Sequence, residues 1–360
     1  MLPSVAEKEK KDMAERVIKA ALLGFGTVGG GVYKVLKMQQ EEMVSKLGAR
    51  VELKKILVRN IEKAAQKTDD PSLLTNNWKE IVDDPEIEIV IELIGGIEPA
   101  RTYILEALEA GKNVVTANKD LIAEYGKELY DAAKEGSADF LFEAAVAGGI
   151  PIIRPLNSSL TADEIDEVTG ILNGTTNYIL SKMASDGSDF ADVLKEAQRL
   201  GYAERNPEAD VEGYDACRKI AILSSLAYGK EVNYEEVYTE GITKITADDF
   251  KYAKVLNRSI KLLASSRKVG NSYSCMVAPF MLSAEHPLCG VNGVFNGIFV
   301  HGNVLGDAMF YGSGSGKLPT ASAVVGDVVD CAKHLHENVM TSWNSEKLDL
   351  MDIKAVSYTH

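Results

Sequence analysis

The feature that most constrains the fold is a glycine-rich turn between a strand-like run and a helical pattern. Residues 17–24 are mostly apolar and stop at a glycine, and apolar residues then recur at helical spacing at Val28, Val32 and Leu36. Between the two lies Gly24-Phe25-Gly26-Thr27-Val28-Gly29, which fits G-x-G-x-x-G. In a dinucleotide-binding sheet, this turn brings backbone amides and a helix N-terminus to the pyrophosphate. We expect these six residues to bind a dinucleotide; a tight turn without a ligand is the alternative.

Strand-like and helical stretches alternate through the first 150 residues. Further apolar, β-branched runs are expected as strands, and amphipathic stretches between them as helices. The strands are expected at Val51–Val58, Ile87–Ile94, Asn113–Thr116 and Phe140–Val146, and the helices between Pro99 and Gly111 and over Leu121–Lys134. Such alternation needs crossover connections, which indicates a mostly parallel sheet with helices on both faces. The fold class is α/β, with a Rossmann-type dinucleotide-binding domain.

The alternation loosens after residue 150, which indicates a second domain of α+β type for substrate binding and dimerisation. Helices are expected near 189–200 and 214–228, and strands at Met276–Leu282 and Gly297–Val300. A helical pattern at 320–336 follows a glycine-rich loop and is expected to pack back on the first domain. The predicted organisation is an N-terminal extension (1–16), a dinucleotide-binding domain (17–150, completed by 312–340), a substrate and dimerisation domain (151–311) and a C-terminal tail (341–360).

The residue that follows the second strand bears on the choice of cofactor. In the dinucleotide-binding pattern, an acidic residue at this place bonds the ribose 2′-hydroxyl. Here the run 51–58 is followed by Arg59, and a guanidinium pairs well with a 2′-phosphate. Arg59 therefore favours NADP or at least admits it beside NAD; a solvent-facing arginine is the alternative.

Charge and composition exclude several classes of protein. A formal net charge of -14 argues against a nucleic-acid binder, which needs a concentrated basic surface. No apolar run approaches the length of a membrane span, and the charged N-terminus lacks the apolar core of a secretory signal. The four cysteines, with no C-x-x-C pair, are expected to be reduced in a cytoplasm.

The most informative stretch runs from Ala197 to Lys219. Its spaced residues are Ala197, Gly201, Asn206-Pro207, Asp210, Gly213, Asp215 and Lys219. This pattern resembles that of the homoserine dehydrogenase family, which interconverts L-homoserine and L-aspartate 4-semialdehyde with NAD(P). The resemblance extends over about residues 18–333, through the glycine motif, Ile94-Gly-Gly, Thr116-Ala-Asn-Lys119, Glu143–Pro151, Asn173–Asn177 and the loop into Leu318-Pro-Thr.

The residues themselves support an acid/base pair in this stretch. Asp215 and Lys219 are four apart, so they share one face of the expected helix. That helix continues through an apolar run, which places the pair in a poorly solvated cleft, where a lysine is suited to proton exchange. An exposed salt bridge on the helix surface is the alternative.

The resemblance implies further roles. It makes Lys219 the group that exchanges the proton of the substrate hydroxyl, with Lys119 as a second active-site lysine and Asp215 beside Lys219. Glu204, which matches the carboxylate that binds the substrate ammonium, is expected to bind substrate with Asp210 and Thr175. Cofactor contacts are also expected from Ile94, Gly95, Lys119 and Gly316, the last in a loop that closes over the nicotinamide end.

The stretch from Glu143 to Ile150 matches the family's monovalent-cation site. Turn carbonyls together with a carboxylate suit Na⁺ or K⁺, with Glu143, Val146, Gly148 and Ile150 as the candidate ligands. A hinge of small residues between domains is an equally good interpretation.

The expected function is homoserine dehydrogenation in threonine, methionine and isoleucine biosynthesis, by a homodimer or homotetramer. The last residues, Glu337–His360, are too few for the amino-acid-binding regulatory domain of many relatives, so a short form is expected. The alternatives are another oxidoreductase acting on a related amino acid and a nucleotide sensor without turnover. The presence of both Lys119 and Lys219 favours the dehydrogenase over these two alternatives.

Overall fold

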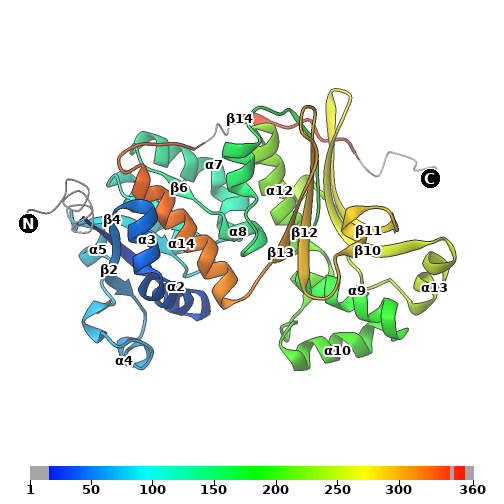
Figure 1. The fold of residues 1–360 in the computed structure, drawn as a ribbon, viewed down its shortest axis with the longest axis horizontal. Coiled ribbons are helices and arrows are strands. Elements are labelled where there is room, and N and C mark those ends of the chain that lie inside the picture. The colour runs from blue at the N-terminus through cyan, green and yellow to red at the C-terminus, as the bar shows by residue number, and fades with distance from the viewer. Residues whose placement is uncertain (1–15, 341–343, 353–360) are drawn as a thin grey trace, which may run out of the picture. The chain divides into compact units, whose positions relative to one another are not determined.

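The computed structural model describes residues 16–340 and 344–352. The chain divides into two compact units (Figure 1). The first takes the described residues up to Ala145 together with Gly316–Met340, and the second takes Val146–Ser315 and the described residues after Thr341. Within the described ranges, no helix is long and apolar enough to cross a membrane.

The first unit is built on a parallel six-stranded sheet in the order β3-β2-β1-β4-β5-β6. The strand order reverses between β1 and β4, and ligands of such sheets bind outside the carboxyl ends of the strands at this point. The strands are β1 (Val17–Leu23), β2 (Arg50–Leu57), β3 (Leu74–Thr75), β4 (Ile87–Glu92), β5 (Asn113–Thr116) and β6 (Phe140–Leu141).

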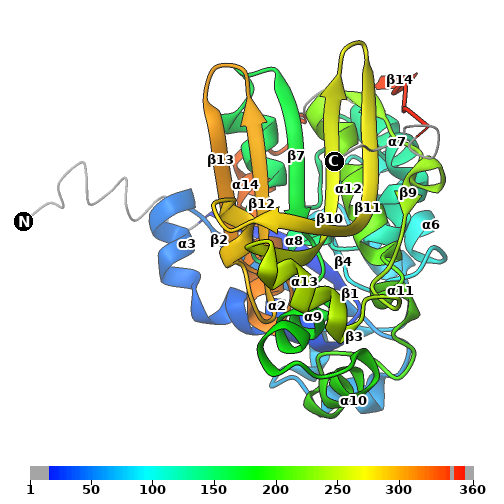
Figure 2. The same ribbon diagram turned by 90° about the vertical axis from the view of Figure 1, so that its right-hand side faces the viewer.

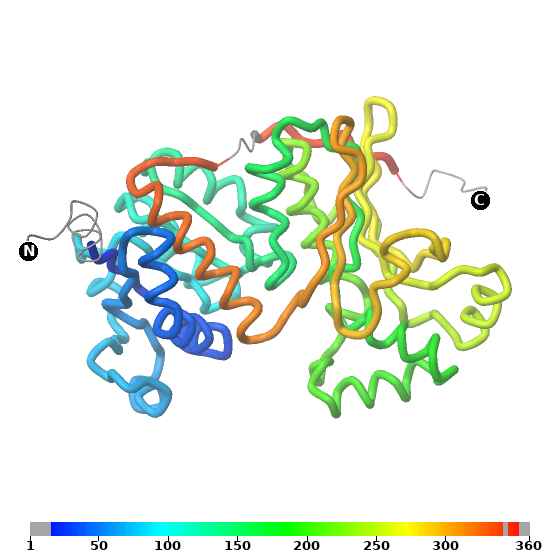
Figure 3. The backbone as a smooth tube through the Cα atoms, in the orientation of Figure 1, coloured from blue at the N-terminus to red at the C-terminus, as the bar shows by residue number. Residues whose placement is uncertain are grey.

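Helices cover both faces of this sheet. One face packs on α2 (Thr27–Met38), α3 (Gln40–Leu47) and α14 (Lys317–Lys333), and together they form an apolar core. Figure 3 shows α14, in orange, running beside α2, in blue, although nearly 300 residues separate them. The other helices of this unit are α4 (Ile61–Ala65), α5 (Lys79–Val82), α6 (Ala100–Glu109) and α7 (Lys119–Glu135); α6 and α7 lie against β4, β5 and β6.

The second unit contains a six-stranded sheet in the order β13-β12-β7-β10-β11-β9 (Figure 2). All neighbours are antiparallel except β9. The strands are β7 (Ile165–Ile171), β9 (Tyr238–Thr239), β10 (Arg258–Val269), β11 (Ser272–Ser283), β12 (Phe295–Gly302) and β13 (Gly306–Ser313). The helices are α9 (Gly174–Asp186), α10 (Phe190–Leu200), α11 (Glu208–Val211), α12 (Tyr214–Tyr228) and α13 (Ala247–Val255), and α9, α12 and α13 pack on the sheet.

The C-terminal residues that were expected to form a tail add a strand to the second unit. Asn344–Lys347 form β14, which pairs in parallel with β8 (Lys230–Glu231). The backbone N–H of Leu348 also donates to the carbonyl of Glu231, at 3.0 Å.

The α/β class with a Rossmann-type sheet is confirmed, and so are most of the expected elements. One expected strand is wrong: Phe140–Val146 does not continue as a strand. β6 ends at Leu141, and Ala144–Ala147 form the short helix α8. The run of alanines prefers helix, and the backbone N–H of Glu143 leaves the sheet to donate to the Asp327 carboxylate, at 2.8 Å.

Candidate active site

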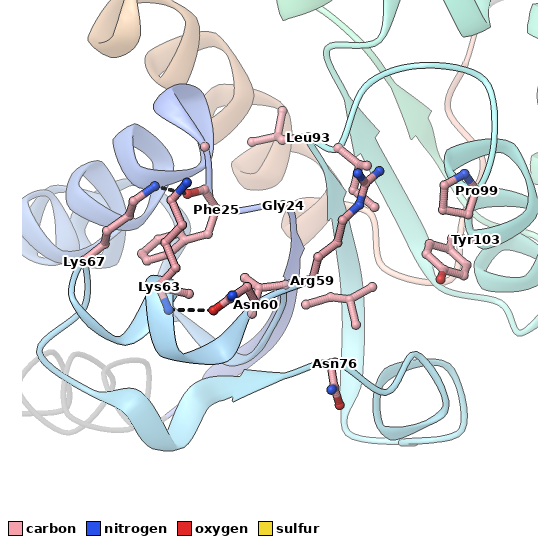
Figure 4. Close-up of a pocket in the computed structure, with 15 residues that line it drawn as sticks. Gly24, Phe25, Arg59, Asn60, Lys63, Lys67, Asn76, Leu93, Pro99 and Tyr103 are labelled. Carbon is pink, nitrogen blue, oxygen red and sulfur yellow. Dashed lines mark hydrogen bonds between the residues drawn. The ribbon is translucent and has the colours of Figure 1, made fainter.

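A cavity of about 750 Å³ lies at the carboxyl ends of β1, β2 and β4 in the first unit (Figure 4). Its position coincides with the reversal of strand order, where the fold predicts a ligand. The residues that line it are Gly24, Phe25, Gly26, Leu57, Val58, Arg59, Asn60, Lys63, Ala64, Lys67, Asn76, Leu93, Ile94, Pro99 and Tyr103.

The three glycines of the motif meet three different constraints. Gly24 has a φ of +93°, and a Cβ on it would lie 2.6 Å from the carbonyl oxygen of Leu93. A Cβ on Gly29 would lie 2.2 Å from the carbonyl oxygen of Gly24, so the close packing of α2 on β1 excludes it. A Cβ on Gly26 would meet nothing within 4 Å. Gly26 therefore leaves open space beside the cavity, where a ligand can approach the backbone.

Among the residues that the structure describes, three cations and no acidic side chain line the cavity. Arg59 follows β2 and is exposed, while Lys63 lies on α4 and Lys67 just beyond it. The ammonium of Lys67 donates to the carbonyl of Phe25, at 3.3 Å, and Figure 4 shows Lys63 and Lys67 on the side of Phe25. This charge pattern suits an anionic ligand. Sequence reasoning missed both lysines, although the four-residue spacing from Arg59 was a signal for them.

A buried carboxylate shapes the loop after β4. Glu92 is fully buried and accepts hydrogen bonds from the N–H of Ile94, at 2.6 Å, and from that of Gly95, at 3.1 Å. The hydroxyl of Thr116 donates to the same carboxylate, at 2.7 Å. Asn118 then caps α7, so that Lys119, half-buried, is the first residue of that helix. The loop that presents Ile94 is thereby tied to the turn that presents Lys119.

The cavity gathers only part of the expected cofactor set. Gly24, Phe25, Gly26, Arg59 and Ile94 line it, whereas Thr27, Val28, Gly29, Gly95, Lys119 and Gly316 are not among its lining residues. Thr27, Val28 and Gly29 form the first turn of α2. Gly316 caps α14 with a φ of +112°.

A polar cluster lies in the second unit, where α12 meets the start of α9. The Lys219 ammonium donates to Asp215 Oδ2, at 2.7 Å, and to the carbonyl of Leu172, at 2.8 Å. Lys219 is 9% exposed and Asp215 7%. The pair is therefore buried on the inner face of its helix, and the alternative of an exposed salt bridge is wrong.

Asn173 joins two carboxylates of this cluster. Its amide nitrogen donates to Asp210 Oδ1, at 2.7 Å, and to Asp215 Oδ2, at 2.9 Å. Its amide oxygen accepts from the N–H of Thr176 and so caps α9, at 2.9 Å. The sequence signalled the cap, since asparagine before a helical run is a good N-cap, but the bridge joins residues about 40 positions apart and was missed.

The other expected substrate-binding residues lie on adjoining segments. Thr175, on the first turn of α9, donates to the carbonyl of Tyr202, at 2.6 Å. Glu204 is exposed on the loop that follows Tyr202, and its main-chain carbonyl accepts from the Gln198 side chain, at 3.0 Å. The structure thus joins Lys219 directly to Asp215, joins Asp210 to Asp215 through Asn173, and places Glu204 on a neighbouring loop.

The candidate cation segment crosses the division between the units. Before the division, Glu143 is buried, at 2% exposed. Beyond it, Gly148 has a φ of +56°, and the N–H of Ile150 donates to the carbonyl of Ala147, at 2.9 Å. No group of three or more His, Cys, Asp or Glu side chains suited to a metal occurs among residues 16–340 and 344–352.

Comparisons with known proteins match almost the whole chain to one family. Residues 151–329 match the family described as homoserine dehydrogenase, and residues 24–143 match its NAD-binding domain. A homoserine dehydrogenase of Synechocystis sp. is 50% identical over 317 residues, which cover 87% of this chain and 73% of the relative.

Comparison with solved structures points to the same family. The homoserine dehydrogenase of Thiobacillus denitrificans has a TM-score of 0.90 at 44% identity, covering 95% of this chain and 81% of that one. A hyperthermophilic archaeal homoserine dehydrogenase in complex with NADPH has a TM-score of 0.74 at 29% identity, covering 88% and 97%. The chain therefore belongs to the homoserine dehydrogenase family of NAD(P)-dependent oxidoreductases.

Proposed function

We propose that Lys219 exchanges the proton of the substrate hydroxyl when L-homoserine and L-aspartate 4-semialdehyde are interconverted. When bound, the nicotinamide cofactor supplies the hydride or accepts it at the carbon that carries this oxygen. During reduction, negative charge grows on the aldehyde oxygen, and a proton from the Lys219 ammonium neutralises it. The products are the alcohol and a neutral lysine, and oxidation runs through the same steps in reverse.

The observation that carries this proposal is the way Lys219 is held. An ammonium has three N–H donors, and two of them are used, on Asp215 Oδ2 and on the carbonyl of Leu172. These two bonds orient the group and leave the third donor for a substrate oxygen. Lys119, at the start of α7, is proposed as a second cation for the same oxygen.

The substrate ammonium is proposed to bind carboxylates of the second unit. Asp210 lies next to the buried pair through Asn173, and Glu204 lies on the exposed loop before α11. An ammonium needs carboxylate partners to offset the loss of its hydration. Thr175, held to the Tyr202 carbonyl, is proposed to contact the substrate from the first turn of α9.

The cofactor is proposed to lie along the cavity of the first unit. Its pyrophosphate fits beside Gly26, where the backbone is open and the N-terminus of α2 begins. Arg59 is proposed to bind a 2′-phosphate, which makes NADP(H) a cofactor at least as good as NAD(H). The absence of acidic side chains from the cavity lining supports this, as does the related archaeal enzyme in complex with NADPH.

A monovalent cation, Na⁺ or K⁺, is proposed at Glu143, Val146, Gly148 and Ile150. The buried carboxylate of Glu143 and the left-handed turn at Gly148 are the observations that suit it. Carbonyls at the end of a helix, here α8, also favour positive charge.

A homodimer or homotetramer in the cytoplasm, serving threonine, methionine and isoleucine biosynthesis, completes the proposal. Large apolar side chains are exposed on strands of the second sheet, at Met281, Phe295, Met309 and Tyr311, and suit a subunit interface. The four cysteines are free, and three of them are buried, which is compatible with a reducing compartment. Light scattering of the purified protein tests the oligomeric state.

The test of the proton role is Lys219→Met, assayed in both directions by absorbance of the reduced cofactor. Loss of a positioned acid/base lowers the rate about 10²- to 10⁴-fold. Lys182→Met is the matched control, because Lys182 also pairs with an aspartate four residues away, Asp186, but on an exposed surface. We expect kcat to fall on this scale for Lys219→Met alone. A Lys219→Met enzyme within about threefold of wild type, far below that range, contradicts the assignment.

A further inference from the structure

Lys261 is a buried lysine that the proposed reaction does not use. It lies on β10 and is 3% exposed. Its ammonium donates to the carbonyl of Val291, at 2.5 Å, to Asn292 Oδ1, at 2.8 Å, and to Asn177 Oδ1, at 3.4 Å. All three acceptors are neutral. A charged lysine buried against neutral groups is uncommon and costly, so its three contacts need an explanation.

The residues that accept from Lys261 belong to α9 and to the 291–295 segment, which leads into β12 and ends at its first residue. Asn177 donates to the carbonyls of Val291 and Phe295, at 3.3 and 3.0 Å. The N–H of Gly293 donates to Ser181 Oγ, at 3.1 Å. A Cβ on Gly174, the first residue of α9, would lie 2.7 Å from the carbonyl oxygen of Val294. The segment therefore lies along α9 from its first residue to its second turn, and Lys261 ties the two together.

The first turn of α9 also organises the polar cluster. Asn173 caps this helix and donates to Asp210 and Asp215, and Asp215 holds the Lys219 ammonium. Any shift of the helix start changes these bonds. We propose that Lys261 is a positioning residue for the reaction: by tying the 291–295 segment to Asn177, it holds the start of α9 where Asn173 joins Asp210 to Asp215. This inference rests on the proposed function of Asp215 and Lys219.

The positive charge matters because three acceptors need three donors. A protonated lysine has three N–H groups and a neutral one has two, so loss of the proton frees one acceptor. Burial lowers the pKa of Lys261 to about 8, an effect that the nearby Cys289 thiol on η4 (Pro287–Gly290) partly opposes. The three hydrogen bonds of the Lys261 ammonium are therefore complete only well below pH 8, and one of them is lost as the pH rises through 8.

The other elements packed around Lys261 carry no charge that acts on it. β11 faces it with Phe280, and α9 faces it with Asn177. α13 packs on β10 and α9 (Figure 2). Its Asp248 pairs with Lys251, and its Asp249 accepts from Thr246 at the helix start. Lys254 is the remaining charged residue of that helix.

The first experiment is Lys261→Met, with Lys268→Met as the control. Lys268 lies on the same strand but pairs with Glu164 at the surface. Displacements of about 1 Å at a catalytic group cost up to about 100-fold in rate, so we expect kcat to fall about tenfold or more in Lys261→Met. The NADPH dissociation constant stays unchanged. Hydrogen exchange of the α9 amides, residues 174–181, becomes faster in Lys261→Met and not in Lys268→Met.

The second experiment uses pH and does not remove the lysine. Asn292 is exposed, so Asn292→Asp places a carboxylate beside the ammonium without disturbing a packed core. A carboxylate raises a lysine pKa, and the alkaline fall of kcat near pH 8 therefore moves to higher pH. In Lys261→Met this fall is absent. A side chain that only fills space gives none of these pH effects.

Three results overturn the proposal. The first is a Lys261→Met enzyme with the kcat and pH profile of wild type. The second is a loss of kcat without faster exchange in α9, which removes the route through the helix. The third is an alkaline fall of kcat that does not move in Asn292→Asp. An active Lys219→Met enzyme contradicts the proposed function and not this inference. In that case, hydrogen exchange of the α9 amides in Lys261→Met still shows whether Lys261 holds the start of α9 in place.

Discussion

The cavity of the first unit and the polar cluster of the second differ in how they are built. The cavity is open, its turn depends on glycine backbone, and the charged side chains that line it are exclusively basic. In the cluster, Asn173, Asp215 and Lys219 are buried and Asp210 is half-buried, and the charges are held by side chains that bond one another. The first arrangement suits a large anionic cofactor, and the second suits the ammonium group of a small substrate and a proton.

This difference predicts what each region tolerates. In the cavity, an added methyl group is harmful and an exchanged surface side chain alters only the choice of ligand. In the cluster, side-chain identity is decisive, because a buried charge that loses its partner is costly. The exposed pair Lys182–Asp186 shows that four-residue spacing alone does not give a buried pair.

The largest effect on stability is expected from Gly29→Ala. Its Cβ would lie 2.2 Å from the Gly24 carbonyl oxygen, so the turn must move, at a cost of about 1–3 kcal/mol in the free energy of unfolding. Both the melting temperature and the affinity for cofactor should fall. Gly26→Ala is the matched variant, since its Cβ meets no protein atom within 4 Å: the melting temperature stays and cofactor affinity alone falls. Equal melting temperatures for the two variants would contradict the different constraints inferred for Gly29 and Gly26.

The next effect is expected from Arg59→Gln. A charge-assisted hydrogen bond contributes about 1.5–3 kcal/mol, so kcat/KM for NADPH should fall about ten- to a hundredfold while that for NADH changes little. Steady-state kinetics with both cofactors measures it. A similar loss for both cofactors removes Arg59 from the 2′-phosphate site. A loss for NADPH in Lys67→Gln but not in Arg59→Gln moves the role to Lys67.

A smaller effect, on KM, is expected from Glu204→Gln. Its proposed task is to hold the substrate ammonium, and the change keeps its size while removing the charge. KM for homoserine should rise about tenfold, the effect of losing roughly one charge-assisted bond, with kcat nearly unchanged. Glu208→Gln, at the start of α11 in the same region, is the control. An unchanged KM leaves Asp210 as the carboxylate for this task.

The smallest effect concerns the cation. If Na⁺ or K⁺ binds at Glu143–Ile150, activity should rise by a few-fold in a saturable manner as either salt replaces a bulky organic cation at constant ionic strength. Glu143→Gln should weaken that dependence. Rates that do not respond to the cation favour a hinge of small residues.

Local pattern was enough to predict the elements that carry the chemistry. The glycine turn, the parallel strands and the shared helix face of Asp215 and Lys219 all follow from spacing within one or two elements. Asn173, Lys67 and Lys261 were not predicted, because their roles arise from contacts between elements far apart in the chain. The short helix α8 was mistaken for a strand because the aromatic residues before it are typical of strands.

The most direct test of this division of tasks is a titration of NADPH against Lys219→Met and Arg59→Gln, combined with single-turnover rates at saturating cofactor. We expect opposite results for the two variants. Lys219→Met binds NADPH as wild type does and turns over about 10²- to 10⁴-fold more slowly, while Arg59→Gln binds NADPH weakly and turns over normally once saturated. Loss of NADPH affinity in Lys219→Met, or a slow saturated turnover in Arg59→Gln, would contradict this division of tasks.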